Sequence, residues 1–205
     1  MTKYIKSIFA GVVIGIGGLS YLSVDNKILG AALFSIGLLL VCFLDFYLYT
    51  GKVSYLKFDV KNMKKSGGNI VAMLIGNFIG AASIGILMSF TNPYIYEKAV
   101  ELCDAKLSEG LFIIPLSILC NFMIFFAVEV FKRQQEGIVK IAIIILCVMV
   151  FILCGFEHSI ANMFYFAAAR KYGTEIFIYL LLNILFNGIG GVLIHRVFKQ
   201  TLQRL

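Results

Sequence analysis

Six long apolar runs constrain this chain more than any other feature of its sequence. A membrane-spanning helix needs about 17–25 mostly apolar residues, and each run reaches that length. Of the 205 residues, 60% are hydrophobic and 14% charged, against roughly 45–50% and 25% in soluble domains, so the surplus must face lipid. The sequence therefore predicts one all-α integral membrane domain over residues 1–205. The expected spans lie at about 7–24, 28–50, 69–91, 108–131, 138–169 and 176–198.

Two of the six runs contain residues that a continuous apolar helix would not tolerate. The fifth run is too long for one straight crossing and contains Gly155 and the pair Glu157-His158, while the second ends in Thr50-Gly51-Lys52. Polar, irregular backbone at membrane depth survives only where it is buried in protein or lines a cavity. We therefore expect the second and fifth helices to be interrupted.

The distribution of basic residues predicts the orientation of the chain in the membrane. Six spans place both termini on one side, and with the termini inside, 13 of the 18 lysine and arginine residues fall in inner segments and 5 in outer ones. This bias predicts cytoplasmic termini in a cytoplasmic-membrane protein. The net charge of +7 then reflects topology, and no nucleic-acid partner is expected. The inner cluster of Lys57, Lys61, Lys64 and Lys65 is interpreted as a solvated loop, with contact to anionic lipid as the alternative.

The sequence carries no recognisable enzyme or metal motif. There is no His-Glu-x-x-His, the second histidine is the distant His195, and no Ser-His-Asp grouping can be drawn from the spacing. The cysteines, at 42, 103, 120, 147 and 154, show no metal-type spacing, and Cys103 alone falls in an expected loop. We expect no catalytic residue, metal or cofactor, and small apolar packing roles for the cysteines.

A few polar residues lie where lipid should not tolerate them. Glu157 and His158 follow an unbroken apolar run, and a charge at the bilayer centre costs at least about 2.5–3.5 kcal/mol, so both need partners or water. Ser159 and Asn162 are close in sequence, and the amide of Asn121 is expected to orient Glu157. His158 is interpreted as a group that lends or carries a proton, with a helix-to-helix hydrogen bond as the alternative.

The third and sixth runs share a short motif. Asn77-x-x-Gly80-Ala81 matches Asn187-x-x-Gly190-Gly191 in corresponding places of the two halves. Halves of three helices each would be inverted relative to one another, because three is odd. In inverted-repeat transporters the site lies near the midplane, where the broken helices meet, so the sequence indicates Thr50 and Glu157-His158.

The sequence resembles the formate/nitrite transporter family, which includes hydrosulfide channels. The resemblance covers about residues 7 to 197 and implies an aquaporin-like fold of six helices in two inverted repeats, assembled as a homopentamer with one pore in each protomer. The matching segments are Gly155-Phe-Glu-His-Ser-Ile-Ala-Asn-Met-Phe164, Leu48-Tyr49-Thr50-Gly51, Cys120-Asn121 and Gly76-Asn77-Phe78-Ile79-Gly80-Ala81.

Carried over by position, the resemblance implies a substrate pathway. The central histidine falls on His158, with Glu157, Thr50 and Asn121 around it, and the vestibule lysine falls on Lys106. The two apolar constrictions fall on Phe34, Leu38, Leu48, Tyr49 and Phe151. Tyr47 stands where the family usually has an acidic residue, and the role of the nearby Asp45 stays open.

The sequence thus favours a channel that moves a small monovalent anion, such as formate, nitrite or hydrosulfide, with or without a proton. An anion would lose water between the apolar rings and meet hydrogen-bond donors at the centre. Three alternatives remain: a neutral-solute channel of the water or glycerol type, a membrane enzyme that uses Glu157 and His158, and a structural or sensor protein with a closed pore. Water flux without anion flux would favour the first, and a covalent or metal adduct the second.

Overall fold

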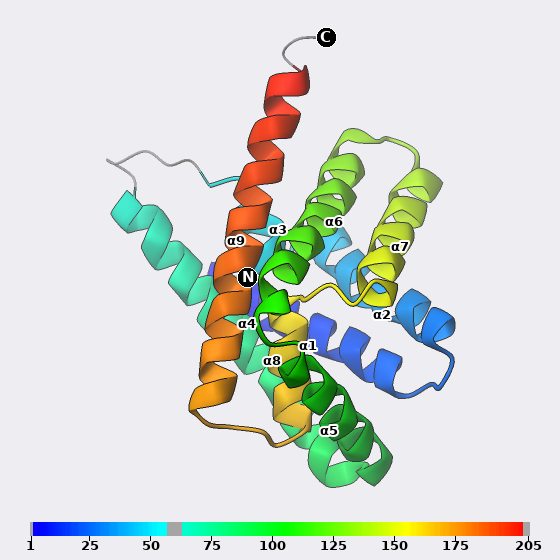
Figure 1. Cartoon of the computed structure of the whole chain (residues 1–205). Helices are drawn as coiled ribbons and strands as arrows, with labels where there is room; N and C mark the ends of the chain where they lie inside the picture. The colour runs from blue at the N-terminus through cyan, green and yellow to red at the C-terminus, as the bar shows by residue number, and fades with distance from the viewer. Residues whose placement is uncertain (1, 57–62, 203–205) are drawn as a thin grey trace.

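The computed structural model describes residues 2–56 and 63–202, and every regular element in this part of the chain is a helix. Figure 1 shows the arrangement. The helices are α1 (Lys3–Leu22), α2 (Lys27–Phe43), α3 (Tyr49–Val53), α4 (Met63–Thr91), α5 (Pro93–Ser108), the 3-10 turn η1 (Gly110–Phe112), α6 (Ile113–Arg133), α7 (Gly137–Leu153), α8 (Ser159–Ala168) and α9 (Thr174–Leu202).

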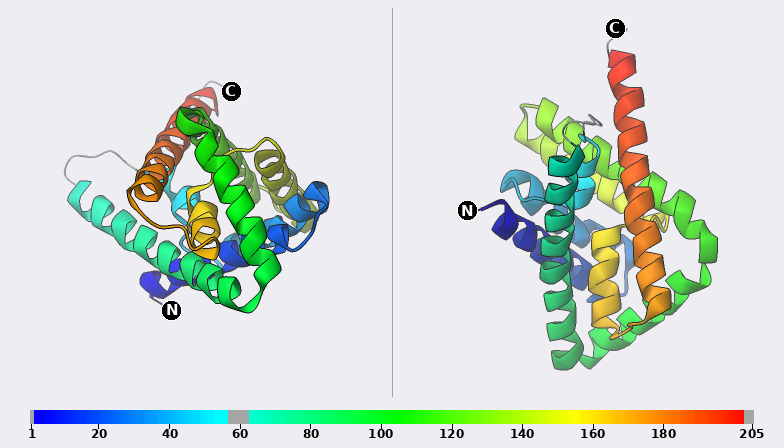
Figure 2. Two further views of the ribbon diagram at one scale, coloured as in Figure 1. Left: turned by 60° about the horizontal axis from the view of Figure 1, so that its bottom comes forward. Right: turned by 90° about the vertical axis from the view of Figure 1, so that its left-hand side faces the viewer.

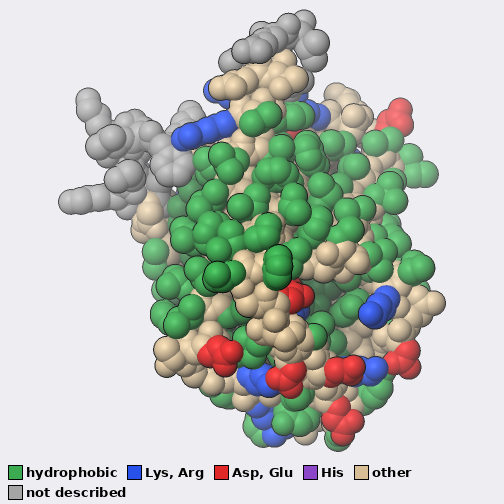
Figure 3. Space-filling view, in the orientation of Figure 1, with side chains coloured by type: hydrophobic (Ala, Val, Ile, Leu, Met, Phe, Trp, Pro, Cys, Tyr) green, Lys and Arg blue, Asp and Glu red, His purple; other side chains and the backbone are tan. Residues whose placement is uncertain are grey.

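Four helices in the described residues are long and apolar enough to cross a membrane, namely those over Lys3–Leu22, Gly67–Thr91, Gly110–Arg133 and Thr174–Thr201. The helices α2 and α7 are apolar but shorter, with 17 residues each. Hydrophobic side chains cover the broad middle of the face in Figure 3, and charged side chains gather at its lower edge, where α5 lies in Figure 1. This apolar belt is what a multi-pass membrane protein presents to lipid.

The chain is interrupted at both places that the sequence indicates. The helix α2 ends at Phe43 before the five-residue α3, and α7 ends at Leu153 before α8. A residue with positive φ follows each of the two helices, Asp45 at 48° and Gly155 at 68°. The backbone N–H of the following residue donates to a carbonyl in the last helical turn, Phe46 to Val41 and Phe156 to Phe151. This is the Schellman pattern of a helix end.

One buried asparagine holds the first interruption in place. The Asn77 Oδ1 accepts a hydrogen bond of 2.9 Å from the Tyr49 backbone N–H. Its Nδ2 donates to the carbonyls of Ser7 and Tyr47, at 2.7 and 2.9 Å. These bonds satisfy backbone groups that the broken helix leaves unpaired.

A second buried asparagine holds the other interruption in the same way. The Asn187 Oδ1 accepts from the Ser159 N–H at 2.9 Å, and its Nδ2 donates to the carbonyls of Ser117 and Glu157 at 2.7 and 2.8 Å. Each residue of this set lies 110 positions after its counterpart in the set around Asn77.

The same offset relates the two closest helix crossings. At Gly80 in α4 an added Cβ would lie 2.0 Å from the carbonyl oxygen of Ile8, and at Gly190 in α9 it would lie 2.5 Å from that of Ile118. Only glycine allows backbones to approach so closely. The pairs α1 with α4 and α6 with α9 therefore pack backbone against backbone.

The short helix α8 forms the centre of the molecule. All ten of its residues are buried, and it contacts α1, α3, α4, α5 and α9. The left view of Figure 2 shows α8 surrounded by the longer helices. Residues near its N-terminus are consequently buried among the longer helices, and Glu157 and His158 immediately precede it.

The segment around Cys103 differs from the loop expected from the sequence. It forms the 16-residue helix α5, in which Asn92 caps the N-terminus and Pro93 occupies the first turn. Its buried residues Ile95, Ala99 and Cys103 recur every four positions, so the helix is amphipathic and lies across one end of the molecule. Such a segment contains no long apolar run, because charged residues occur between the buried ones, and it therefore does not stand out among the spans.

Candidate functional site

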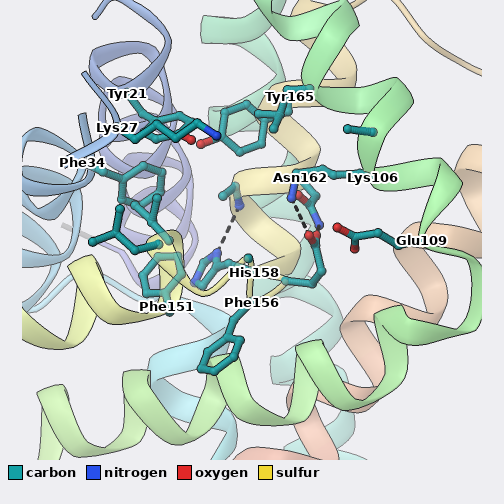
Figure 4. Close-up of a pocket in the computed structure, with 17 residues that line it drawn as sticks. Tyr21, Lys27, Phe34, Lys106, Glu109, Phe151, Phe156, His158, Asn162 and Tyr165 are labelled. Atoms are coloured by element: carbon teal, nitrogen blue, oxygen red, sulfur yellow. Dashed lines mark hydrogen bonds and ion pairs between the residues drawn. The ribbon is translucent and has the colours of Figure 1, made fainter. Parts of the chain in front are cut away.

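Six of the residues expected at the site line a cavity of about 240 Å³ that opens beside α5, which we call the α5-side cavity (Figure 4): Phe34, Lys106, Phe151, Glu157, His158 and Asn162. Its deep end is apolar. The Phe34 and Phe151 rings meet edge to face there, with centroids 5.7 Å apart and an interplanar angle of 89°. The His158 side chain lines the cavity beside them.

A second cavity, of about 130 Å³, lies beside α3. We call it the α3-side cavity; Leu48, Gly51, Lys52 and Lys132 contribute to its lining. Thr50 is fully buried and lies in the chain between Leu48 and Gly51. Since Thr50 also bonds His158, it connects the side chains that line the two cavities.

His158 is buried and has both ring nitrogens engaged. Its Nδ1 accepts a hydrogen bond of 3.1 Å from the Ala161 N–H, which caps α8. Its Nε2 lies 2.9 Å from the Thr50 Oγ1. Because Nδ1 is an acceptor, a neutral ring carries its proton on Nε2 and donates to Thr50. The ring also stacks on Phe151, with centroids 5.8 Å apart.

Glu157 is buried with its charge compensated. The Lys106 Nζ lies 2.5 Å from one carboxylate oxygen, and the Asn162 Nδ2 donates to the other at 2.6 Å. The exposed fractions of the Lys106 and Glu157 side chains are 12% and 1%, so the pair sits inside the protein at the edge of the cavity. A buried carboxylate is tolerated when it is paired and hydrogen-bonded in this way.

Asn183 is a site residue that the sequence reading missed. Its Nδ2 donates to the Ser117 Oγ at 2.7 Å and to the Glu157 carbonyl at 2.8 Å, and its Oδ1 accepts from Asn162. It lies one turn before Asn187 in α9, on the same face. Two asparagines four residues apart in an apolar helix are a signal that could have identified it.

The structure places Asn121 differently from the prediction that it orients Glu157. Its Nδ2 lies 3.3 Å from the Thr50 carbonyl oxygen and 3.4 Å from the Ser54 Oγ, while its buried Oδ1 has no hydrogen-bond partner. That prediction is wrong because sequence distance does not show which neighbour an amide on α6 faces. Asn121 belongs to the surroundings of Thr50.

Among the expected constriction residues, Tyr49 lies elsewhere. Its hydroxyl donates to the Ile184 carbonyl at 2.9 Å, and it lines a groove along α9 instead of either cavity. A phenol in an apolar ring of the pore would lack this partner, whereas α9 supplies one. Leu48 lines the α3-side cavity, and Leu38 is buried without lining either cavity.

Asp45, whose role the sequence left open, joins two lysines. Its carboxylate lies 3.1 Å from the Lys6 Nζ and 3.0 Å from the Lys52 Nζ. Because its side chain is 64% exposed, these ion pairs contribute little stability. They fasten the start of α1 to α3 at the rim of the α3-side cavity.

Two further sets of basic residues belong to this end. Glu129 pairs with Arg133, four residues later in α6, at 2.7 Å. In the basic cluster, Lys57 and Lys61 lie outside the described residues, as do the side chains of Lys64 and Lys65.

Comparisons with known proteins agree with this architecture. The family model described as formate/nitrite transporter matches residues 1–199. The chain is 31% identical over 184 residues to the uncharacterized transporter YrhG of Bacillus subtilis (strain 168), covering 84% of this chain and 69% of that protein. It is 27% identical to the nitrite transporter NirC of Escherichia coli (strain K12), in a match that covers 95% of this chain and 80% of that protein.

A solved structure shares the fold. A structure described as a pentameric formate channel with formate bound superposes with a TM-score of 0.82, covering 98% of this chain and 94% of that one, at 24% identity.

Proposed function

Because the chain belongs to the formate/nitrite transporter family, a family of channels and not of enzymes, we propose that it conducts a small monovalent anion through the two cavities. Formate, nitrite and hydrosulfide are the candidate substrates. The buried contact between His158 and Thr50 carries this proposal, because it places hydrogen-bond donors at the point where the two cavities approach each other.

The proposed fold in the membrane has six spans in two inverted halves. In one half α1, α2 with α3, and α4 cross; in the other α6, α7 with α8, and α9 cross. The hydrogen bonds around Asn77 and Asn187, repeated at an offset of 110 residues, support this pairing. The basic residues near the α3-side cavity support a cytoplasmic location for that end and for both termini in the cytoplasmic membrane, so the α5-side cavity faces outward.

The proposed assembly is a homopentamer in the lipid bilayer, in which each protomer has its own pore. The support is the likeness to a structure described as pentameric and the location of both cavities within one chain.

The apolar constriction selects among anions because each anion must lose water to pass it. An anion that passes the Phe34 and Phe151 rings leaves most of its hydration behind, at a large electrostatic cost. The Thr50 hydroxyl, the Asn121 amide and the His158 Nε2–H then supply the donors that replace this water. Divalent anions are rejected because the site has no compensation for a second charge.

His158 acts in this proposal as a hydrogen-bond donor. A neutral ring that gave its single proton on Nε2 to the anion would become an imidazolate, which is far too costly near neutral pH. Protonation of Nδ1 would remove the acceptor of the Ala161 N–H and place a positive charge at the N-terminus of α8, which the helix dipole disfavours. Any proton that accompanies the anion therefore reaches it through water or through a short-lived imidazolium.

Reconstitution into liposomes tests the proposal. We expect flux of formate, nitrite or hydrosulfide that exceeds flux of lactate and chloride at both pH 5.5 and pH 7.5, conditions chosen on either side of the unperturbed histidine pKa of about 6.5. Water flux without anion flux would reverse this assignment in favour of a neutral-solute channel.

Replacing Phe151 with alanine should weaken selectivity by size. Loss of the ring opens one side of the contact with Phe34, and we expect the preference for formate over acetate to fall by about tenfold, the order by which one methyl group is discriminated in an apolar site. Paired flux assays with the two acids measure it. Phe177→Ala on α9, at a ring that is 67% exposed, is the control; an unchanged preference in Phe151→Ala would contradict the constriction.

A further inference from the structure

The α5-side cavity contains one lysine that has no ion-pair partner among the described residues. Four charged side chains line it: Lys27, Lys106, Glu109 and Glu157. The Lys106 ammonium is already paired with Glu157 at 2.5 Å, so the field of one charge cancels most of the field of the other. The vestibule role that the family resemblance implies for Lys106 therefore does not follow from its charge in this chain.

Lys27 is placed where an anion would enter. Its side chain is exposed and takes part in no ion pair or hydrogen bond within the part of the chain that the structure describes. It lines the α5-side cavity and also an adjoining hollow at the surface, where Asp25 and Lys98 pair at 3.1 Å. Figure 4 shows Lys27 and Phe34 on the same side of the cavity.

The geometry of α2 aligns Lys27 with the constriction. Phe34 and Leu38 follow Lys27 by seven and eleven residues, which places all three on one helix face. At a rise of 1.5 Å per residue, Lys27 lies about 10 Å from Phe34 along the helix axis. One face of α2 thus presents an ammonium at the mouth and an aromatic ring at the deep end.

We propose that Lys27 is the residue that captures the anion at the outer mouth, while Lys106 holds Glu157 in place. This inference rests on the proposed function, since it concerns the entry step of the same pathway. The captured species is a small monovalent anion that still carries most of its water, because charged side chains line the cavity at this level and the rings of Phe34 and Phe151 lie deeper.

Glu109 opposes Lys27 in the same cavity. One of its carboxylate oxygens is buried without a hydrogen-bond partner, and burial, followed by the charge of Glu157, raises the pKa of this carboxyl above its usual 4.5, while Lys106 acts in the other direction. When Glu109 is ionised, the four charges that line the cavity sum to zero; when it is protonated they sum to +1. The other charged and titratable groups that line this cavity are Tyr21 on α1, Lys27 on α2, Lys106 on α5, Glu157 and His158 before α8, and Tyr165 on α8. Tyr179 on α9 also interacts with Glu109, and Asp25, Lys98 and Glu101 line the adjoining hollow.

Uptake of formate added at the outer side, measured against its concentration, tests the role of Lys27. In Lys27→Gln we expect the half-saturating concentration to rise about fivefold, the order for one partly screened charge, and the effect to shrink as ionic strength increases. The double variant Asp25→Asn/Lys98→Gln removes a neutral ion pair from the adjoining hollow, so it leaves the net charge at the mouth unchanged and should match the wild type. An unchanged half-saturating concentration in Lys27→Gln overturns the inference, whereas absence of anion flux in the wild type overturns the proposed function instead.

A chemical rescue keeps the test decisive if the glutamine variant assembles poorly. Lys27→Cys is labelled with a methanethiosulfonate reagent that adds either an aminoethyl or a sulfonatoethyl group, with labelled wild type as the baseline for the native cysteines. The positive label should restore the wild-type half-saturating concentration and the negative label should raise it further. Equal effects of the two labels would contradict a role for charge at this position.

Glu109→Gln should have the opposite effect. Because the pKa of Glu109 lies above its usual value, wild-type capture should strengthen as the pH falls through that raised pKa. In Glu109→Gln the neutral side chain is present at every pH, so the half-saturating concentration at pH 7.5 should fall about fivefold and the improvement on acidification should disappear. A pH profile identical to that of the wild type would show that Glu109 has no part in capture at the outer mouth.

Discussion

Replacing His158 with alanine is expected to lower anion flux about 10- to 100-fold, the equivalent of one hydrogen bond to a charged group in a site without water. The Nε2–H of His158 is aligned with the Thr50 hydroxyl at 2.9 Å, at the level where the anion has the least hydration. Without this donor, the anion passes the constriction with its charge poorly compensated. Flux assays in liposomes measure the loss.

Alanine also removes the cap of α8, so a second variant must separate the two roles of His158. Asparagine is a favourable N-cap residue, and His158→Asn can keep an acceptor for the Ala161 N–H while it removes the ring. We expect His158→Asn to assemble like the wild type and still to conduct poorly. Full flux in His158→Asn at every pH would show that the ring serves only to cap α8.

Thr50→Val tests the partner of His158 with almost no change in shape. The valine retains the volume of threonine but removes the hydroxyl, so it leaves the Nε2–H without its acceptor. We expect a loss of flux similar in order to that of His158→Asn, and a double variant little worse than either, because the two side chains act through one hydrogen bond.

Replacing Asn187 with leucine is expected to have the largest effect on stability. This amide satisfies the Ser159 N–H and the carbonyls of Ser117 and Glu157, all buried. Each unsatisfied buried group costs about 1–3 kcal/mol, so the variant should lose about 3 kcal/mol or more. For a chain of this size that corresponds to a fall in Tm of about 10 °C, measured by thermal unfolding of the purified protein in detergent.

Two variants make this result interpretable. Asn77→Leu breaks the corresponding set of bonds at the first interruption and should destabilise the protein by a similar amount. Asn26→Ala, which removes an exposed cap of α2, should cost only about 1 kcal/mol. If Asn187→Leu were no worse than Asn26→Ala, the asparagine would not be what holds the break between α7 and α8.

The sequence indicated the interruptions correctly because apolar helices leave polar residues conspicuous. Thr50 and His158 lie in separate runs, and both had been associated with the site from their polarity and their place near breaks; the structure brings them into hydrogen-bond contact. Asn121 and Tyr49 were harder to place, since their directions depend on how α6 and α3 are rotated against their neighbours. Asn183 was overlooked although its spacing from Asn187 puts both on one helix face.

The sequence shows where charged residues occur along the chain, but it does not show which of them form ion pairs. The number of lysines near each end of a span can be counted in the sequence, and it predicts orientation. Which lysine is compensated is a matter of distances: Lys106 lies 2.5 Å from Glu157, while Lys27, one of five basic residues expected on the outer side, is left to line the mouth.

The sequence by itself determined that the chain requires lipid, where its helices break and which polar residues are buried in them, because burial of apolar area and the cost of burying polar groups are properties of each segment. Only the tertiary structure decided which of those polar groups meet. Glu157 meets Lys106 of α5 and two asparagines of α9, and no local rule relates segments so far apart in the chain. Their meeting depends on the close packing of α4 against α8, where a Cβ added at Gly85 would lie 2.6 Å from the Phe164 carbonyl oxygen, because this contact joins the two halves.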